Sequence, residues 1–458
     1  QAEDGIRERS PSRGLGDVYK RQKKGDIFAD RGLVEEALVA YQVVPERYAA
    51  EAVLVENSHY KVAELIHESR GMDAAVSSYK SAITDVESRR FQAKTQLTIA
   101  RLMFDEGKYE DAAAEYRVYL SAYPDQAVRL GFQEDKVLLR LGNCFQFAGQ
   151  DKSASDPDGS QPLLDQGITH YERLLEEYPE SPLREDAVFG LGFTHQVKGN
   201  NDQARSQFSR LVKDAADHAA APNALMQLAR IAFEEEDFGQ AEDHYREFVE
   251  RYADSKLVNS VHMELGLTYE RMRKYPEAIS SFGKIDENWE QWPKIQVKGA
   301  ELHMALQQYG EAEAVLAKAM GRVQDQALKS QLHYMAGRIN FVQQEYGPAI
   351  DELGKTLELS NSDEIVESAL LARGSAHYEL AKVHDTVGDK DASKISYEAS
   401  LTDMQNLLDR APGPYIKDSA YRTLGASMIS LGRVGEAAEY YDELIADTKE
   451  VQEQATFR

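Results

Sequence analysis

The side chains in this sequence with the most chemical potential are eleven histidines and one cysteine. His377 and His384 are seven residues apart, which puts them on one face of a predicted helix, where they could share a metal ion. No HExxH motif and no tight His/Asp cluster accompanies them, so packing or solvent exposure is the simpler interpretation. Cys144 lies beside Gly142 on a predicted core helix with no histidine next to it, which favours a buried, inert thiol over a nucleophile.

One stretch offers oxygen ligands of the kind that calcium prefers, at Asp151, Ser153 and Ser155. A calcium loop also needs glycine at its sixth position and glutamate at its twelfth, where this sequence has Asp156 and Pro162. The motifs GxxxxGK[ST], GxGxxG after a strand and GxSxG are absent from the sequence. We therefore expect no metal, no cofactor, no catalytic residue and no enzymatic activity.

The amino-acid composition restricts the classes of molecule that this protein is expected to bind. Acidic residues number 78 and basic residues 53, which gives a net charge of −25. A nucleic acid or an anionic membrane surface is disfavoured, because phosphate binding needs concentrated Lys and Arg. Apolar residues make up 42%, enough for a folded core, and the single cysteine excludes internal disulfides. No run of about 18 apolar residues could span a bilayer as a helix, so we expect a protein or peptide partner.

A repeat runs along the chain from about residue 23. Its anchor is a small residue, followed four positions later by an aromatic residue or leucine. The anchor pairs are Ala37/Tyr41, Ala75/Tyr79, Ala112/Tyr116, Gly167/Tyr171, Ala204/Phe208, Ala241/Tyr245, Ala278/Phe282, Ala312/Leu316, Ala349/Leu353, Ser393/Tyr397 and Ala437/Tyr441. The commonest spacing between anchors is 37 residues, and a second small residue usually stands twelve residues before the anchor. Small residues on two successive helices let the backbones approach closely, so each unit is predicted to be an antiparallel helix pair.

Turn residues fall where such pairs need them. Gly107, Gly149, Gly199, Gly388 and Gly432 are expected to close the first helix in a left-handed conformation. No segment shows the sustained period of two that is typical of strands. The sequence therefore predicts an all-α fold of about eleven antiparallel helix pairs, in a single solenoid over residues 23–458.

Three departures from the regular period carry information. Residues 1–22 show no helical or strand period, and the segment from Asp17 to Gln22 resembles a translated transposon-end tag; we expect a disordered, non-native scar and a natural N-terminus that is missing. One anchor spacing of 55 predicts a loop insertion at 150–164, between the two helices of the fourth unit. Spacings of 44 on either side of Ser393 exceed 37 by about two helical turns, so the helices are expected to lengthen there.

The repeat resembles the tetratricopeptide repeat (TPR). The resemblance is carried by residues 107–112 (GKYEDA), followed by Tyr116 and Pro124, and by residues 275–278 (YPEA), followed by Phe282. It covers about residues 23–449, and it implies a right-handed superhelix of TPR-like helix pairs. The common spacing of 37 departs from the usual 34. Four anchor positions also differ from the family pattern, at Gly167, Ser393, Leu316 and Leu353.

In proteins similar to this one, the first helix of each pair lines a concave groove. Carrying that register over gives the predicted partner-binding residues Lys94, Arg101, Arg140, Asn143, Phe193, Arg230, Leu267 and Arg338. Arginine, asparagine and aromatic side chains recurring within an acidic chain indicate a peptide groove. The alternative is that these side chains only solvate an exposed face. The family's carboxylate clamp, with paired Lys and Asn four residues apart, is not reproduced.

We expect a non-enzymatic scaffold whose groove binds a partner peptide or helix. An alternative is the regulatory repeat array of a larger enzyme or signalling protein whose other domains are missing, and the oligomeric state is left open. The sequences at 123–125, 177–182 and 248–255 resemble those of bacterial envelope TPR proteins of the β-barrel assembly and Tol-Pal type. This resemblance favours a periplasmic or cell-envelope location, with the cytoplasm as the alternative.

Overall fold

The computed structural model describes residues 11–442 and residue 445, with side chains from residue 18 onward. The described residues form helices and no strand, which confirms the predicted all-α, TPR-like fold class. The chain divides into two compact units, unit 1 up to residue 231 and unit 2 from residue 232. The boundary falls inside α12 (Ala221–Glu234). A single continuous solenoid over both units stays a prediction.

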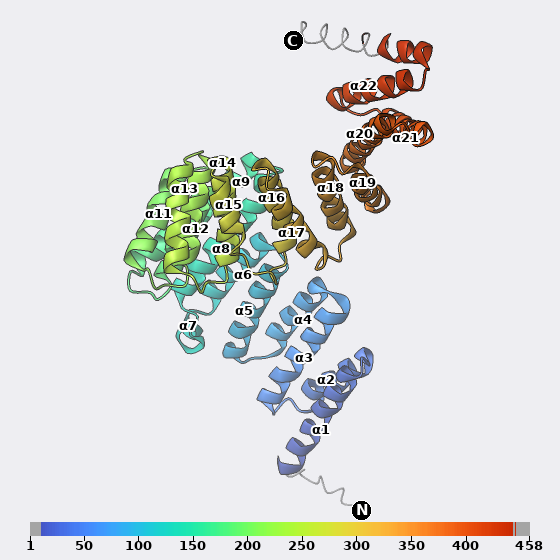
Figure 1. Ribbon diagram of the computed structural model, residues 1–458. Helices are drawn as coiled ribbons and strands as arrows, with labels where there is room; N and C mark the ends of the chain where they lie inside the picture. Colours follow the sequence, from blue (N-terminus) through green and yellow to red (C-terminus); the bar gives the residue numbers. More distant parts are fainter. Residues whose placement is uncertain (1–10, 443–444, 446–458) are drawn as a thin grey trace, which may run out of the picture. The chain divides into compact units, whose positions relative to one another are not determined.

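Unit 1 is built from consecutive helices that pack in antiparallel pairs (Figure 1). Its helices before α12 are α1 (Pro11–Asp30), α2 (Val34–Arg47), α3 (Ala52–Arg70), α4 (Met72–Asp85), α5 (Arg89–Asp105), α6 (Tyr109–Ala122), α7 (Pro124–Leu130), α8 (Glu134–Ser153), α9 (Pro157–Glu177), α10 (Arg184–Val197) and α11 (Asn201–Asp214). The pairs are α1 with α2, α3 with α4, α5 with α6, α8 with α9 and α10 with α11. The short α7 stands between pairs and packs against α5 and α6.

Unit 2 has the same organisation. Its helices after α12 are α13 (Phe238–Arg251), α14 (Val258–Arg271), α15 (Tyr275–Phe282), α16 (Trp292–Ala305), α17 (Tyr309–Met320), α18 (Gln326–Val342), α19 (Tyr346–Leu359), α20 (Asp363–Val387), α21 (Lys390–Leu408) and α22 (Pro414–Ser430). A further helical segment follows at 434–442. In chain order, with α7 set aside, the described helices alternate as the first and second members of the eleven pairs that the repeat predicts.

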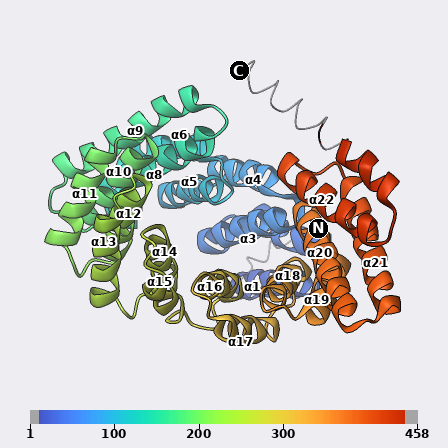
Figure 2. The same cartoon turned by 45° about the horizontal axis from the view of Figure 1, so that its top comes forward.

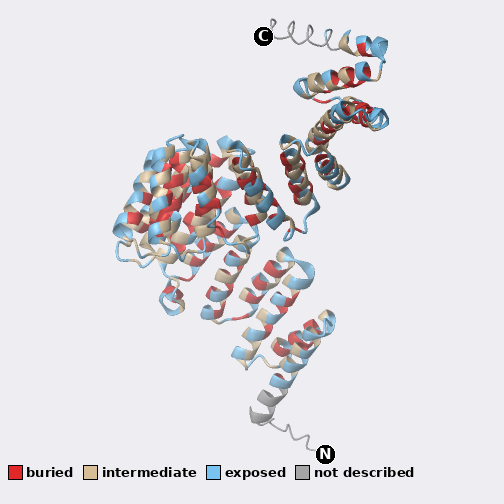
Figure 3. Ribbon diagram, viewed as in Figure 1, coloured by how far each residue is buried: buried red, intermediate tan, exposed pale blue. Residues whose placement is uncertain are grey.

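The core lies between paired helices, on the faces that they turn toward each other (Figure 3). The two small residues of each repeat decide how closely the helices approach. A Cβ placed on Gly192 would lie 2.8 Å from Cε1 of Phe208, and one on Gly425 would lie 2.6 Å from Cζ of Tyr441. The aromatic residue therefore fills the space that the small residue leaves in its own pair, and the predicted close packing is confirmed.

Residues 11–22, which the sequence indicates to be disordered, form the start of α1. They are helical because α1 packs as the first helix of a pair. Gln22 Nε2 donates to Ser58 Oγ of α3 at 3.1 Å, and a Cβ on Gly25 would lie 2.5 Å from Cε1 of Tyr41. The expectation of disorder is therefore wrong for this segment. The first ten residues lie outside the described residues, and the tag interpretation stays a prediction.

The insertion at 150–164 is helical rather than a loop, apart from residues 154–156. α8 runs to Ser153 and α9 begins at Pro157, so the insertion lengthens both arms of one hairpin (Figure 2). The prediction of a projecting loop is wrong. Residues that are typical of loops here start a helix and close a tight turn.

Local hydrogen bonds explain this outcome. Asp156 is the N-cap of α9, and its Oδ1 accepts from the Gly159 backbone N–H at 3.0 Å. Ser160 Oγ donates to the Gly149 carbonyl at 2.7 Å, which ties the two arms together. Gly149 lies inside α8 and does not close it in a left-handed turn; a Cβ there would lie 2.6 Å from Cδ2 of Leu164.

In most pairs the turn between the two helices has one left-handed residue, five positions before the anchor. Gly107, Gly199, Gly388 and Gly432 have φ between 76° and 85° there, as expected. In four other repeats the same position holds a larger residue with φ between 59° and 65°: Glu236, Arg273, Gln307 and Gln344. These side chains hold a backbone conformation that favours glycine.

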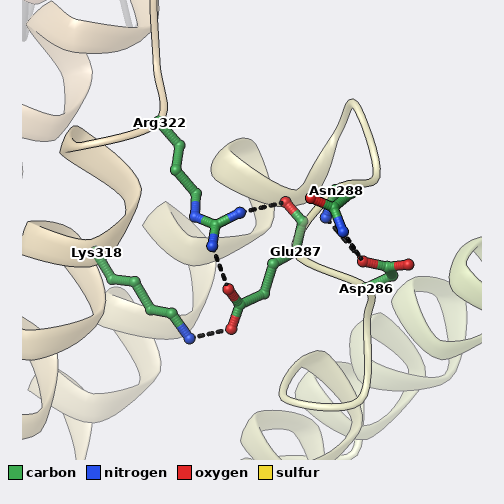
Figure 4. Close-up of polar contacts among 5 residues, drawn as sticks. All are labelled: Asp286, Glu287, Asn288, Lys318 and Arg322. Atoms are coloured by element: carbon green, nitrogen blue, oxygen red, sulfur yellow. Dashed lines mark hydrogen bonds and ion pairs between the residues drawn. The ribbon is translucent and has the colours of Figure 1, made fainter.

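α15 is a second helix that ends early, at Phe282. A loop follows it and leads to α16, which begins at Trp292. Glu287 of this loop accepts hydrogen bonds from Lys318 of α17 and from Arg322, two residues after the end of that helix, the latter from Nη2 at 2.6 Å (Figure 4). The same two cations lie 5.7 and 5.5 Å from the centroid of the Trp292 ring. The C-terminal end of α17 and the turn after it thus hold the loop against the next pair by ionic and cation–π contacts.

The hairpin of α20 and α21 is longer than its neighbours, with helices of 25 and 19 residues, which confirms the predicted lengthening. An ion pair between a buried carboxylate and a half-buried guanidinium group joins the two helices. Arg373 donates to Asp403 through Nε at 2.9 Å and Nη2 at 2.6 Å. Removal of either partner would leave a poorly solvated charge, so this pair keeps the long arms in register.

Candidate functional site

A groove with a volume of about 500 Å³ crosses α1, α3 and α5 in unit 1. We call it the first-helix groove, because the first helices of three pairs line it. Its lining residues are Gln22, Asp26, Tyr41, Asn57, Tyr60, Lys61, Glu64, Tyr79, Lys94, Thr98 and Arg101. Lys94 and Arg101, two of the residues predicted from the sequence, are thus brought together on one surface.

α5 positions the cationic side of the groove. The helix starts after Ser88, whose Oγ accepts from the Phe91 backbone N–H at 3.3 Å as an N-cap. Lys94, Thr98 and Arg101 follow at intervals of four and three residues, which places all three on one face of the helix. The buried face of the same helix packs in the core of unit 1.

The two cations are available to a ligand. The Lys94 ammonium lies 4.6 Å from the centroid of the Tyr60 ring, a cation–π contact that holds it over the groove. Arg101 is exposed and, among the described residues, has no ion pair or hydrogen bond to its guanidinium group. A guanidinium group has five N–H donors and no acceptor, so it suits carboxylates and carbonyl oxygens.

Tyrosines from second helices form the floor. Tyr41 OH donates to Asp26 Oδ1 at 2.8 Å, which fixes that carboxylate at the α1 end of the groove. Burial, with help from the Glu64 charge, raises the pKa of Tyr79 to about 12, although the Arg101 charge opposes the shift. These phenols therefore stay protonated at neutral pH and act as hydrogen-bond donors or acceptors.

Arg140 and Asn143 lie on α8, in the next pair of unit 1. Burial raises the pKa of Tyr116 to about 12, and the charges of Arg140 and Arg101 both oppose that shift, so the two guanidinium groups lie near the same tyrosine. Asn143 Oδ1 accepts from Tyr171 OH at 2.7 Å, so part of this side chain already serves the fold. Arg140 extends the cationic surface, whereas Asn143 is largely a structural residue.

The remaining predicted residues of unit 1 are Phe193 and Arg230, both half-buried. Phe193 stacks on Phe189 in α10 with ring centroids 6.3 Å apart. Arg230 lies on α12. Neither lines the first-helix groove, and their role in binding stays a prediction.

Leu267 and Arg338 belong to unit 2. Leu267 is partly buried and packs against the core around α14 to α18, which is a structural role. Arg338 is exposed on α18, and its guanidinium lies 5.7 Å from the centroid of the Tyr334 ring. Their part in partner binding stays a prediction.

The sequence analysis missed the α1 and α3 side of the groove. The signal for α3 was present: Asn57, Lys61 and Glu64 lie one period of 37 residues before Lys94, Thr98 and Arg101. Of the two α1 residues that line the groove, Gln22 falls within the segment 1–22 that was interpreted as a scar, whereas Asp26 lies in the first repeat and was not identified. The sequence around Tyr41 and Tyr79 does not show that their hydroxyl groups reach the groove. Their access depends on the small residue that packs beside each ring.

The first-helix groove presents charged, amide and hydroxyl side chains. In the part of the chain that the structure describes, no group of three His, Cys, Asp or Glu side chains is placed to hold a metal ion. Cys144 is buried as expected, and burial raises the pKa of its thiol to about 12, which disfavours the thiolate. Among the described helices none is both long and apolar enough to cross a membrane.

Comparison with known proteins gives a family match in the middle of the chain. Residues 194–256 and 226–290 match the family model described as tetratricopeptide repeat. The chain has no sequence match among curated proteins.

Several solved structures are similar at low identity. The C-terminal part of a TPR repeat-containing protein from Cytophaga hutchinsonii is 14% identical with a TM-score of 0.45, covering 59% of this chain and 98% of that one. A tetratricopeptide repeat protein from Parabacteroides merdae is 14% identical with a TM-score of 0.32, covering 69% and 98%. Yeast Tom70 is 14% identical with a TM-score of 0.34, covering 96% and 95%. The fold assignment rests on the helix pairs of this chain: it is an all-helical repeat protein, and its residues 194–290 match the tetratricopeptide repeat model.

Proposed function

We propose that this chain is a non-enzymatic scaffold for protein–protein interaction, and that the first-helix groove holds an extended segment of a partner protein. The face of α5 carries the proposal. Lys94, Thr98 and Arg101 line one side of the groove, and among the described residues neither cation has an ion pair. Solvated charges that the fold itself does not use are the groups that a partner can engage.

The charges of the groove limit the segment that fits. Asp26 on α1 and Glu64 on α3 supply carboxylates toward one end, where Lys23 and Lys61 already pair with them at 3.4 and 3.3 Å, whereas Lys94 and Arg101 on α5 supply cations that are unpaired among the described residues. A complementary segment carries a carboxylate at the α5 end. Charge complementarity of this kind sets the register of the segment and excludes wrong partners.

The test reverses the cationic side. The triple variant Lys94→Glu, Arg101→Glu and Arg140→Glu is expected to weaken partner capture at least about tenfold, because it places like charges against the bound carboxylate. Capture is measured by quantitative mass spectrometry of proteins retained from cells of the source organism. Circular dichroism should show unchanged helicity, since all three residues are exposed.

The matched control reverses three other exposed cations of unit 1, Arg90, Lys108 and Arg129, which do not line the groove. The control has the same net charge as the test variant, so a difference between them reports the position of the charge. Equal capture by the two variants would refute the groove assignment.

A cell-envelope location is a further part of the proposal. It rests on the resemblance of the segments around Tyr123, Tyr178 and Tyr252 to those of bacterial envelope TPR proteins. The same three tyrosines are the C-caps of α6, α9 and α13, with φ between −128° and −129°. Fractionation of cells that express the tagged full-length gene tests the location, and recovery in the cytosol alone would contradict it.

A further inference from the structure

A second groove of unit 1 lies on the other face of α3, between α2 and α4. Its volume is about 900 Å³. We call it the second-helix groove; it is lined by residues between 41 and 49, between 52 and 62, and between 78 and 88. On α3, Asn57, Lys61 and Glu64 face the first groove, whereas Val55 and Val62 face the second.

The groove is open because small side chains line it where larger ones would fill it. Ser78 and Ser81 of α4 line one wall, and Ala49 and Ala52 line the connection between α2 and α3. Pro45, close to the end of α2, lines the opposite wall. Apolar surface from Pro45 and the two valines of α3 leaves room for the aliphatic part of a long side chain.

The charged groups that line the groove are all carboxylates. Glu46, Asp85 and Glu87 line it, and no Lys or Arg does. Among the described residues, none of the three carboxylates has an ion pair; Asp85 accepts one hydrogen bond, from Ser81 Oγ at 3.1 Å. His59 lies on the floor with a buried Nε2 that has no hydrogen-bond partner. These groups match a ligand that brings positive charge and several N–H donors.

Unit 2 contains a groove at the same position of its repeats, between α13 and α15, with a volume of about 520 Å³. His262 stands there at the repeat position of His59, four residues before the small residue of the first helix, and its buried Nδ1 also has no partner. Lys284 stands at the position of Ser81, six residues after the anchor alanine.

The two grooves therefore share a floor and differ in charge. In unit 2 the chain supplies its own cations, because Lys284 and Arg246 both line the groove. In unit 1 the equivalent positions hold Ser81 and Gln42, and three carboxylates line the walls. The internal comparison indicates that the missing positive charge comes from outside the chain.

We propose that the second-helix groove of unit 1 binds an arginine-bearing segment of a partner protein. The aliphatic stem lies along Val55 and Val62, and the guanidinium group donates to the carboxylates of Asp85 and Glu46. Arginine suits the groove better than lysine, because its planar fork can donate to two acceptors at once. This site goes beyond the proposed scaffold function, since it lies on the opposite face of α3 from the first-helix groove.

The test uses a fluorescein-labelled nine-residue peptide with three arginines spaced by Gly and Ser, and its counterpart with three lysines. Binding is measured by fluorescence anisotropy on the full chain at low and moderate salt. The unaltered chain should bind the arginine peptide several-fold more tightly than the lysine peptide. Ser81→Lys, which installs the cation that unit 2 holds at this position, should weaken binding of the arginine peptide at least about tenfold. Ser81 is exposed, so this variant should keep its fold.

Two further variants separate the groove from general attraction to an acidic chain. Asp85→Asn with Glu46→Gln removes two carboxylates of the groove and should weaken binding about as much as Ser81→Lys. The control, Glu250→Gln with Glu277→Gln, removes two carboxylates from the equivalent groove of unit 2 and should leave binding unchanged. Equal affinity of all these proteins for the arginine peptide, or equal affinity of the unaltered chain for the two peptides, would overturn the proposal.

Discussion

The ring of Tyr171 occupies the space that a side chain at Gly142 would need. A Cβ on Gly142 would lie 2.5 Å from Cε1 of this ring, and Tyr171 is fully buried. The same ring closes the space beside Gly190 in the next pair, where a Cβ would lie 2.5 Å from Cζ. One aromatic side chain therefore joins two successive helix pairs, which is why each repeat depends on its neighbour for stability.

The contact between Gly142 and Tyr171 predicts that two Gly→Ala substitutions change the free energy of unfolding in opposite directions. Gly142→Ala should lower the free energy of unfolding by about 1–3 kcal/mol, because the added methyl group clashes with Tyr171. Gly299→Ala on α16 should instead raise it by up to about 1 kcal/mol, since the nearest atom to its Cβ is 3.9 Å away and alanine favours helix. Urea unfolding followed by circular dichroism measures both. A stabilised Gly142→Ala variant would contradict the packing described.

The left-handed turn positions predict a stabilising substitution. Gln344 has φ of 65°, a conformation that costs a residue with a side chain about 1–2 kcal/mol, so Gln344→Gly should stabilise unit 2 by about 0.5–1 kcal/mol after the greater flexibility of unfolded glycine is included. The reverse change at the equivalent turn of unit 1, Gly107→Gln, should destabilise by a similar amount. Thermal unfolding of the two variants gives the comparison. If both substitutions move the unfolding temperature in the same direction, backbone strain does not explain the changes in stability.

A half-buried histidine whose Nδ1 is buried predicts acid sensitivity of unit 1. Burial, together with the charges of Arg117 and Arg173, lowers the pKa of His170 from 6.5 to about 4, and its ring stacks on Phe145 at 5.6 Å. The unfolded chain therefore binds a proton at a higher pH than the folded chain. The stability that the neutral imidazole contributes is present above pH 6.5 and is lost as the pH falls toward 4.

The measurement is urea unfolding at intervals from pH 8 to pH 4. His170→Gln cannot titrate in this range, so its stability should fall less with pH, by a difference of about 1–2 kcal/mol; partial solvent access makes this smaller than the full pKa shift implies. Above pH 7 the free energies of unfolding of the two proteins should differ by a constant amount. Parallel profiles over the whole range would show that His170 does not carry the acid sensitivity.

Several features of this protein follow from the sequence alone. The period of 37 residues and the alternation of small and aromatic residues predict helix pairs, because close backbone approach depends only on side-chain size at fixed positions. The same register places Lys94 and Arg101 on one face of α5, because residues seven positions apart in a helix point in nearly the same direction.

Other features were decided by partners distant in the sequence. Residues 11–22 are helical because Gln22 bonds to Ser58 on α3, and residues 150–164 extend a hairpin because Ser160 bonds to a carbonyl of the opposite arm. Loop-like composition cannot reveal such partners, because Ser, Asp, Pro and Gly cap helices as readily as they form turns.

Sequence by itself determined that this chain is a helical repeat protein, and it determined which residue types each first helix presents. Tertiary structure decided where the grooves open and which charges in them stay unpaired. The physical reason is that a repeat encodes local spacing, whereas a groove is the space left between helices, and its volume depends on every side chain that packs around it.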